Sequence, residues 1–472
     1  MHARIVFSLA LLVALFHPAY GNNKLPDTVK QELTKYKIPI DALSIELKSV
    51  DNQISILSVN GDTPRNPASV MKLLTTLAAL ELLGPAYTWK TRYYADGKLE
   101  NGRLNGNLVL LGGGDPYMIT DQFRQQLHLL KDQGLRIIAG DLIIDNSAIQ
   151  IQNHNRAKFD GRPQRVYNVA PSASMVNFSA TRIILQPEHN KIRIITEPPA
   201  TNLVIQNELY PAKSRCRNRW AGWSFKTFRH NHNTVLNFNG KYPTRCGATE
   251  FTRAFLSNTE YTYGLFKSSW TEMGGHLEGH VRLGPRPETS ELLLRADSKP
   301  LAEVIRGINK FSNNVMARQL LVTIGKELYG TPGTAANGTL GIKQWLRSKS
   351  VSMPELVIEN GAGLSRISRI SARSLSRLLQ LGWESNYRPE FLSSLALAAV
   401  DGTMRKRLRP EAPAGRVRIK TGSLNGTRSM AGYIKSGGGQ HYSIVMFLNH
   451  NKVSFRSGSR IQDALLRWIL RR

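Results

Sequence analysis

Acidic residues are scarce in this chain of 472 residues. Only 34 Asp and Glu stand against 63 Lys and Arg, so the formal net charge at pH 7 is +29. Such an excess favours an anionic partner, such as a nucleic acid, an acidic membrane surface or a cell-wall polymer. It fixes neither the fold nor the chemistry.

Low-complexity sequence is also absent. The 38 Gly and 22 Pro are spread along the chain, and 41% of the residues are hydrophobic. This composition excludes collagen-like and disordered chains and is typical of globular proteins. The length exceeds the roughly 250–300 residues at which single cores stop growing, which predicts two or three domains.

Long apolar runs are missing except at the amino terminus. There, Arg4 precedes the apolar stretch 5–16, and the small residues Ala19 and Gly21 follow it. An apolar stretch of about 12 residues is too short to span roughly 30 Å of hydrocarbon. Residues 1–21 therefore predict a cleaved signal peptide and a periplasmic protein, with a membrane anchor as the alternative. Export makes a nucleic-acid partner unexpected.

Cysteine is rare, with two residues in the whole chain. In an oxidising compartment, Cys216 and Cys246 are candidates for one disulfide. Such a bridge would close a loop of about 30 residues and stabilise the fold by roughly 3–4 kcal/mol. Two free buried thiols are the alternative.

The first periodic segments predict a hairpin and a buried helix. Residues 42–47 and 54–59 alternate apolar and polar side chains, which is typical of paired strands. The segment from Asn66 to Leu83 predicts a helix of about four turns, ended by Gly84 and Pro85. It is apolar nearly all round, which indicates burial.

Ser69 and Lys72 lie three residues apart on this helix, so their side chains share one face. A nucleophilic hydroxyl and a basic amine could then meet on one rigid element. The motif alone is weak, because Ser-x-x-Lys should arise about twice by chance in a chain of this length. Ser69 as a helix cap is the alternative. A lysine inside an apolar helix is more unusual, since a buried ammonium is costly.

Two further motifs follow in order. Ser312 and Asn314 form a Ser-x-Asn triplet in a segment from Phe311 that we expect to open another helix. An alternating strand from Val417 ends in Lys420-Thr421-Gly422. Ser-x-x-Lys, Ser-x-Asn and Lys-Thr-Gly in this order are the signature of penicillin-binding proteins and class A β-lactamases. A helix cap for Ser312 and a solvated strand end for Lys420 are the alternatives.

The chain as a whole resembles the S13 family of D-alanyl-D-alanine carboxypeptidases and endopeptidases, the penicillin-binding protein 4 type. Beyond the three motifs, the resemblance rests on segments 108–116, 140–147, 359–365 and 400–404 and on the long separation between Ser69 and Ser312. Two positions depart from the family pattern. Asn360 stands where the family usually has Asp, and Ser423 stands where Thr is usual.

The motifs suggest a division of roles for acyl transfer. We expect Ser69 to be the nucleophile, Lys72 the general base, Ser312 the proton relay and Asn314 the orienting amide. Lys72 must lose its proton, and burial together with the charge of Lys420 would lower its pKa. For substrate binding we expect four consecutive residues: Lys420, Thr421, Gly422 and Ser423.

Within this set, Lys420 and Thr421 would hold the substrate carboxylate, and Gly422 would allow close approach. The backbone N–H groups of Ser69 and Ser423 would form the oxyanion hole. No cofactor is expected, and the chain has no metal-binding motif.

The positions of the motifs predict a catalytic domain built from both ends of the chain. The expected fold class is α+β, and the resemblance implies an antiparallel sheet flanked by helices, like that of serine β-lactamases and penicillin-binding proteins. We expect the catalytic domain at 22–90 and 280–472, a mainly β accessory insertion at 91–165 and 255–279, and an inner inserted domain at 166–254.

The expected activity is that of a serine D,D-carboxypeptidase or D,D-endopeptidase acting on peptidoglycan stem peptides and acylated by β-lactams. One alternative is a β-lactamase. Another is an inactive, secreted protein that binds a polyanion through segment 210–230, which interleaves six cations with aromatic residues. The apolar carboxyl-terminal segment predicts a helix that covers the catalytic sheet, with peripheral membrane contact as the alternative. The sequence does not define the oligomeric state.

Overall fold

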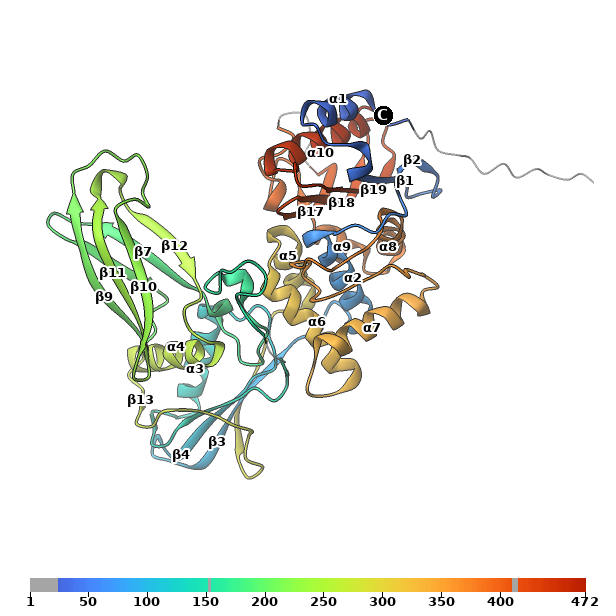
Figure 1. The fold of residues 1–472 in the computed structure, drawn as a ribbon. Helices are drawn as coiled ribbons and strands as arrows, with labels where there is room; N and C mark the ends of the chain where they lie inside the picture. Colours follow the sequence, from blue (N-terminus) through green and yellow to red (C-terminus); the bar gives the residue numbers. More distant parts are fainter. Residues whose placement is uncertain (1–23, 152–153, 410–414) are drawn as a thin grey trace, which may run out of the picture.

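We describe the protein from a computed structural model, which describes residues 24–151, 154–409 and 415–472. The expected signal peptide lies outside these residues. Among the described residues, no helix is long and apolar enough to cross a membrane. The chain forms two parts, which we call the body (24–89 and 298–472) and the arm (90–297), with the arm projecting to one side (Figure 1).

The body is built on a six-stranded sheet with the order β16-β17-β18-β19-β1-β2. All neighbouring strands are antiparallel. Its strands are β1 (Leu43–Ser49), β2 (Ser55–Val59), β16 (Ala396–Leu397), β17 (Val417–Leu424), β18 (Thr427–Lys435) and β19 (His441–Asn449). The predicted hairpin is confirmed as β1 and β2. Because β1 also pairs with β19, both ends of the chain meet at the centre of this sheet.

One face of the sheet is covered by the two terminal helices, α1 (Asp27–Lys35) and α10 (Phe455–Leu470), which pack on each other (Figure 1). Alternate strand residues such as Met430 and Met446 point into this layer. Ile461 and Leu465 of α10 are fully buried there. The final helix therefore covers the sheet, and the membrane-contact alternative for its apolar face is wrong.

The opposite face carries the remaining helices of the body. They are η2 (Ala68–Met71), α2 (Lys72–Leu83), α5 (Leu301–Phe311), α6 (Asn314–Tyr329), α7 (Ala335–Ser348), α8 (Ala372–Glu384) and α9 (Arg388–Ser394). Ala431 and Phe447 of the sheet pack against this group. The helix predicted in the segment from Asn66 to Leu83 is present, with a 3₁₀ first turn that begins at Ala68, and every residue from Lys72 to Leu80 is buried. The short turns η1 (Ile40–Ala42) and η6 (Gly402–Met404) complete the body.

The arm begins with a seven-stranded mixed sheet next to the body. Its strands are β3 (Lys90–Glu100), β4 (Arg103–Leu111), β5 (Ile137–Ile138), β6 (Leu142–Asp145), β13 (His276–Leu277), β14 (Val281–Leu283) and β15 (Glu291–Asp297). Helices α3 (Thr120–Asp132) and α4 (Asn258–Glu272) accompany it. The domain boundary predicted after residue 279 placed β14 and β15 in the catalytic domain. In the structure β14 pairs with β6 and β15 pairs with β3, and both of these partners belong to the arm. The periodicity of a strand shows that it exists and does not show which strand it pairs with.

The far end of the arm consists of two three-stranded sheets, β10-β11-β9 and β12-β7-β8. The strands are β7 (Thr181–Pro187), β8 (Ile192–Glu197), β9 (Leu203–Ala212), β10 (Trp223–His230), β11 (Asn233–Pro243) and β12 (Thr249–Arg253), with the turn η5 (Thr244–Cys246). The turns η3 (Val166–Asn168) and η4 (Asn177–Ser179) lie against the body instead, where η3 contacts α6 and Phe178 packs on the body's core. Aromatic rings fill the space between these sheets; Phe225 stacks on Phe251 with ring centroids 5.5 Å apart. The apolar cluster of the arm runs without interruption from this end to the seven-stranded sheet.

Candidate functional site

Ser69 lies in η2, immediately before α2. Pro67 is the residue at the cap position of η2, so the alternative that Ser69 is a helix cap is wrong. The preceding residue, Ala68, has φ of +47°, a left-handed conformation that is uncommon outside glycine. Gly363 packs against this bend so closely that an added Cβ would lie 1.8 Å from the Ala68 carbonyl oxygen. The backbone before Ser69 is therefore held in a special conformation by a neighbouring loop.

Lys72, the first residue of α2, is fully buried and has three oxygen atoms around its amine. Its Nζ lies 3.1 Å from Ser69 Oγ and donates to Asn314 Oδ1 and to the Ala362 carbonyl, each at 2.5 Å. Burial lowers the pKa of Lys72 well below its ordinary value, and the charges of Lys420 and Arg318 lower it further.

A neutral amine fits this environment. It has two N–H donors for the two carbonyl acceptors, and one lone pair that can accept the proton of a hydroxyl. Ser69 supplies the only hydroxyl among the three partners of Lys72 Nζ in the described chain. The arrangement is therefore suited to removing the Ser69 proton.

Ser312 and Asn314 lie at the junction of two helices. The helix predicted in the segment from Phe311 is present as α6, which begins at Asn314 with Asn313 as its N-cap, whereas Phe311 itself is the last residue of α5. Ser312 has φ of +58° between the two helices. Its hydroxyl accepts a hydrogen bond from Lys420 Nζ at 2.9 Å. Ser312 occupies the C-cap position of α5 while its hydroxyl is directed to the third motif.

Lys420 lies on β17 and is fully buried, so the alternative of a solvated strand end is wrong. Besides Ser312, its amine donates to the Thr421 carbonyl at 2.7 Å. Burial lowers the pKa of Lys420 to about 7. The hydroxyls of Thr421 and Thr403 are 2.8 Å apart, which adds a residue from η6 to this side of the site.

Gly422 allows β17 to lie directly against η2. A Cβ added at Gly422 would lie 2.1 Å from Ser429 Oγ, 2.8 Å from the Pro67 carbonyl oxygen and 3.0 Å from the Ser69 nitrogen. The Ser429 hydroxyl donates to the Pro67 carbonyl at 2.6 Å and so links β18 to the same turn. The strand that carries Lys420 is thereby in contact with the segment that carries Ser69.

Asn360 supports the carbonyl that contacts Lys72. Its Oδ1 accepts from Ala362 N at 3.0 Å, and its Nδ2 donates to the Leu364 carbonyl at 2.8 Å. A carboxylate at this position could accept the first hydrogen bond and could not donate the second. Asn360, which replaces the usual Asp, therefore holds the 359–364 loop with two side-chain hydrogen bonds.

Sequence reasoning gave no role to Arg318, Ala362 or Thr403, although the last two lie in segments that carry the family resemblance. Arg318 is nine-tenths buried on α6, one turn after Asn314, and donates to the carbonyls of Tyr167 and Val169 in the arm. A detectable signal was its position among apolar residues of a buried helix, where a cation is unusual. Ala362 acts through its backbone, which no side-chain pattern reveals.

A cavity of about 550 Å³ adjoins the 359–364 loop, between the body and residues 150–151 and 154–171 of the arm. Its described lining is rich in basic side chains, namely His154, Arg156, Lys158, Arg318 and Arg366, whereas Glu359 is its single acid. This space is suited to a ligand with carboxylate groups. Within the described residues, no group of three or more His, Cys, Asp or Glu side chains is placed to hold a metal ion.

Comparison with known proteins agrees with this geometry. A curated relative, the D-alanyl-D-alanine carboxypeptidase DacB of Haemophilus influenzae, is 25% identical over 94% of this chain and 91% of its own length. The D-alanyl-D-alanine carboxypeptidase of Actinomadura sp. strain R39 is 26% identical over 93% of this chain and 85% of its own length.

Solved structures show the same fold. Penicillin-binding protein 4 from Haemophilus influenzae superposes with a TM-score of 0.79 at 22% identity, covering 94% of this chain and 99% of that one. A complex of that protein with a β-lactam has a TM-score of 0.75. The family model for the D-Ala-D-Ala carboxypeptidase 3 (S13) family matches residues 25–471. The chain therefore belongs to the D-Ala-D-Ala carboxypeptidase 3 (S13) family.

Proposed function

We propose that this protein is a periplasmic serine D,D-carboxypeptidase, with D,D-endopeptidase action on cross-links, that hydrolyses peptidoglycan stem peptides through an acyl-enzyme. The observation that carries the proposal is the buried amine of Lys72, which lies 3.1 Å from Ser69 Oγ and has a lowered pKa. Family membership supplies the substrate class. The periplasmic location rests on the signal expected at residues 1–21.

In the proposed acylation step, Ser69 Oγ attacks the carbonyl carbon of the penultimate D-alanine while its proton passes to Lys72 Nζ. The backbone N–H groups of Ser69 and Ser423 stabilise the oxyanion. The carbon–nitrogen bond then breaks, and Ser312 relays the proton to the departing amino group. Water hydrolyses the resulting ester, which restores Ser69 and releases the shortened peptide.

Recognition of the terminal carboxylate falls to Lys420 and Thr421. With a pKa of about 7, Lys420 is only partly charged in the free protein at neutral pH. An arriving carboxylate favours the protonated form and raises that pKa. Lys420 would thus become charged when the substrate binds. In the empty site, its neutral form avoids the free-energy cost of burying a charged amine.

The basic cavity beside Asn360 would accommodate the rest of the stem peptide. Its volume of about 550 Å³ lies within the range of small-molecule sites. The basic lining complements a peptide that carries side-chain and terminal carboxylates. The amide of Asn314, which contacts Lys72, would orient the scissile bond between this cavity and Ser69.

The decisive experiment combines covalent labelling with product analysis. We expect labelled penicillin to add to Ser69, as located by mass spectrometry, and Lys72→Ala to lower the acylation rate by about 10² or more. Monomeric and cross-linked muropeptides should yield free D-alanine and resolved dimers. An adduct on another residue, or Lys72→Ala with the acylation rate of the wild type, would refute the roles. Absence of both products would refute the activity.

A further inference from the structure

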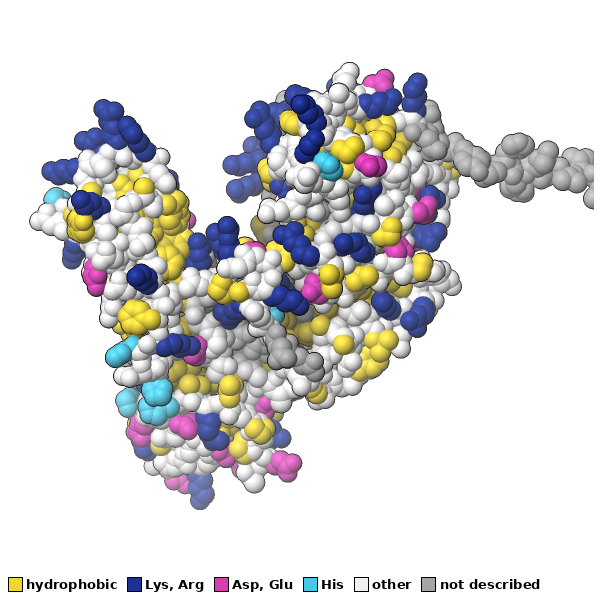
Figure 2. Space-filling view, viewed as in Figure 1, with side chains coloured by type: hydrophobic (Ala, Val, Ile, Leu, Met, Phe, Trp, Pro, Cys, Tyr) yellow, Lys and Arg dark blue, Asp and Glu magenta, His cyan; other side chains and the backbone are white. Residues whose placement is uncertain are grey.

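Six cations cluster at the far end of the arm, and we call them the basic tip. They lie on the loop between β9 and β10, on β11 and on η5: Lys213, Arg215, Arg217, Arg219, Lys241 and Arg245. All six are exposed, and none has an acidic partner within the described chain. Figure 2 shows basic side chains gathered at this end of the arm.

Elsewhere in the arm several cations are paired with acids, in contrast to the whole group at the tip. Arg182 contacts both Glu197 and Glu250, and Arg193 contacts Glu188 at 3.0 Å. Like charges held close together repel one another and destabilise the folded state. The absence of neutralising acids at the tip therefore calls for a ligand that supplies the negative charge.

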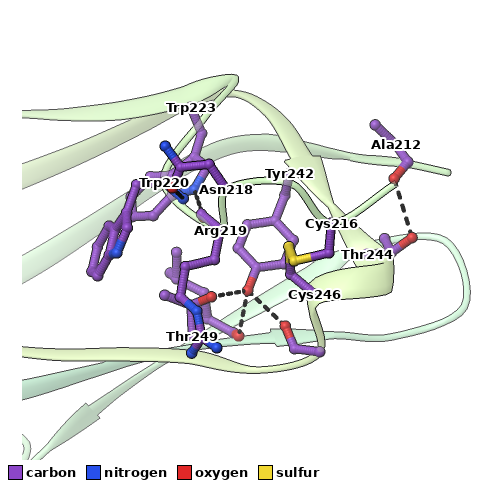
Figure 3. The surroundings of a disulfide bond; sticks show 12 residues. Ala212, Cys216, Asn218, Arg219, Trp220, Trp223, Tyr242, Thr244, Cys246 and Thr249 are labelled. Carbon is purple, nitrogen blue, oxygen red and sulfur yellow. Dashed lines mark hydrogen bonds between the residues drawn. A yellow bond between two sulfur atoms is a disulfide. The ribbon is translucent and has the colours of Figure 1, made fainter. Parts of the chain in front are cut away.

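The loop that carries the tip is fixed in place at two points (Figure 3). Cys216 and Cys246 form a disulfide with a Cα–Cα distance of 4.9 Å, as the two cysteines of the sequence suggested. At the other end of the loop, Trp220 packs on Trp223 with ring centroids 5.6 Å apart, and Trp223 Nε1 donates to the Arg219 carbonyl at 2.9 Å. The cations are thus presented from an anchored loop, which lowers the entropy lost when they bind.

The open face of sheet β10-β11-β9 continues from the tip with groups suited to sugars. Asn237 and Asn239 donate to Glu208 at 2.9 and 2.7 Å across the strands. On the same sheet Tyr210 and Phe228 are half-exposed, at 50% and 45%. Planar amide and carboxyl groups can hydrogen-bond hydroxyls, and exposed rings can lie against apolar faces.

We propose that the basic tip and this open sheet face bind the peptidoglycan polymer, with cations on stem-peptide carboxylates and the sheet face on the glycan. The polymer class rests on the proposed function, because the active site would act on the same material. The positive charge of the tip complements the negative charge of a polymer that carries carboxylates, which is why we assign this class of ligand to the surface. The arm would then hold the polymer while the body cleaves a peptide on it, across the hollow between them (Figure 2).

The test measures co-sedimentation of the full-length protein with purified sacculi. A Ser69→Ala background removes digestion of the sacculi, so that binding is read without catalysis. The tip variant is Lys213→Glu/Arg215→Glu/Arg217→Glu. The matched control, Lys24→Glu/Lys35→Glu/Lys37→Glu, changes the net charge equally at exposed positions of the body.

We expect the tip variant to bind sacculi at least about tenfold more weakly than the control variant. Binding of the protein with an unaltered tip should weaken as the salt concentration rises, because salt screens the charges of the tip. The same substitutions with Ser69 intact should leave acylation by penicillin unchanged, which shows that the fold persists and separates this proposal from the catalytic one. Tip-variant binding equal to that of the control would overturn the proposal. So would tip-dependent binding of a single-stranded oligonucleotide without binding of sacculi.

Discussion

At the residue scale, the site depends on two lysines whose amines are both fully buried and differ in their partners. Lys72 faces two carbonyls and one hydroxyl, whereas Lys420 faces the Ser312 hydroxyl and one carbonyl. No carboxylate neutralises either amine within the described chain. Burial therefore favours the neutral form of each amine. In the proposed mechanism, Lys72 would take up a proton during attack, and Lys420 would gain one when an anionic substrate binds.

The lowered pKa of Lys420 predicts a pH-dependent stability. Between pH 7 and 10.5 the unfolded chain binds this proton and the folded chain does not, so the free energy of unfolding rises with pH across that window. Compared with Lys420→Met, the wild type should gain about 1 kcal/mol more per pH unit between pH 7.5 and 10. Denaturant titrations at several pH values measure this. The exposed control Lys98→Met should keep the wild-type slope, and an unchanged slope in Lys420→Met would contradict the burial argument.

Asn360→Asp tests the supporting loop. The substitution keeps the bond from Ala362 N, removes the donor to the Leu364 carbonyl and adds negative charge near Lys72. We expect a loss of about 1 kcal/mol in stability. Because a negative charge favours a protonated lysine, acylation should also need a higher pH. The control Asn360→Ala should lose stability without the shift in the pH–rate profile, and identical profiles for the two variants would argue against an electrostatic link.

The sequence predicted the residues that act through side chains better than those that act through the backbone or through burial. Ser69, Lys72, Ser312 and Lys420 belong to motifs with fixed spacing, and the structure brings them together. Ala362 contributes a carbonyl, which every residue has, so its sequence carries no sign of that contact. Arg318 carried a weak sign, a cation on an apolar helix, but its contacts lie in the arm and depend on tertiary structure.

At the scale of elements, the site depends on the contact between β17 and η2. Neither element carries a complete site, because η2 positions Ser69 and β17 positions Lys420. Gly422 and the hydrogen bond from Ser429 to Pro67 set the separation between them. Close packing at a backbone-to-backbone contact leaves no room for a side chain there.

Gly422→Ala should therefore separate the two elements. The added methyl group overlaps Ser429 Oγ, the Pro67 carbonyl and the Ser69 nitrogen, so β17 or η2 must move. We expect acylation by labelled penicillin to slow by about 10²-fold, as is typical for a displacement of about 1 Å in a site. As a control, Gly284→Ala adds a methyl group that meets only Ile143, at 3.9 Å. A Gly422→Ala rate within about twofold of wild type would show that the contact is dispensable.

Local periodicity predicted the elements better than their ends and partners. Both strands of the first hairpin and the buried helix after Ser69 are present because each has a clear apolar pattern. The helix predicted from Phe311 begins only at Asn314, because Phe311 still belongs to α5 and just two residues separate α5 from α6. The prediction assigned β15 to the wrong domain, because the partner of a strand depends on tertiary structure and not on its local sequence.

At the scale of the whole molecule, the body and the arm have separate main apolar cores. Two small apolar clusters join them, one with Val169 of the arm and Val315 of the body and the other with Ile149 and Val322. The two layers of the body enclose its central sheet, and one cluster runs through the arm. Arg318 is one of the polar links between the parts, through its bonds to Tyr167 and Val169. Separate cores allow one part to lose stability without the other.

Removal of the disulfide should test this independence. We expect Cys216→Ser/Cys246→Ser to lower the stability of the far end of the arm by about 3–4 kcal/mol, because the bridge closes a loop with a sequence separation of 30. Limited proteolysis should cut the arm faster, while acylation by penicillin stays at the wild-type rate. Slower acylation together with faster cleavage of the body would show that the two parts unfold as one.

The pairing of β1 with β19 has a consequence for the order in which the protein becomes active. The segment with Ser69 and Lys72 is synthesised early, but β17, which brings Lys420, and β19, which closes the sheet on β1, follow more than three hundred residues later. Pairing of such distant segments is a late event in folding, because a long loop must close first. A nascent chain that lacks residues 417–449 thus contains the proposed nucleophile without the strand that completes its site. The hydrolase is assembled only when its carboxyl-terminal end returns to its beginning.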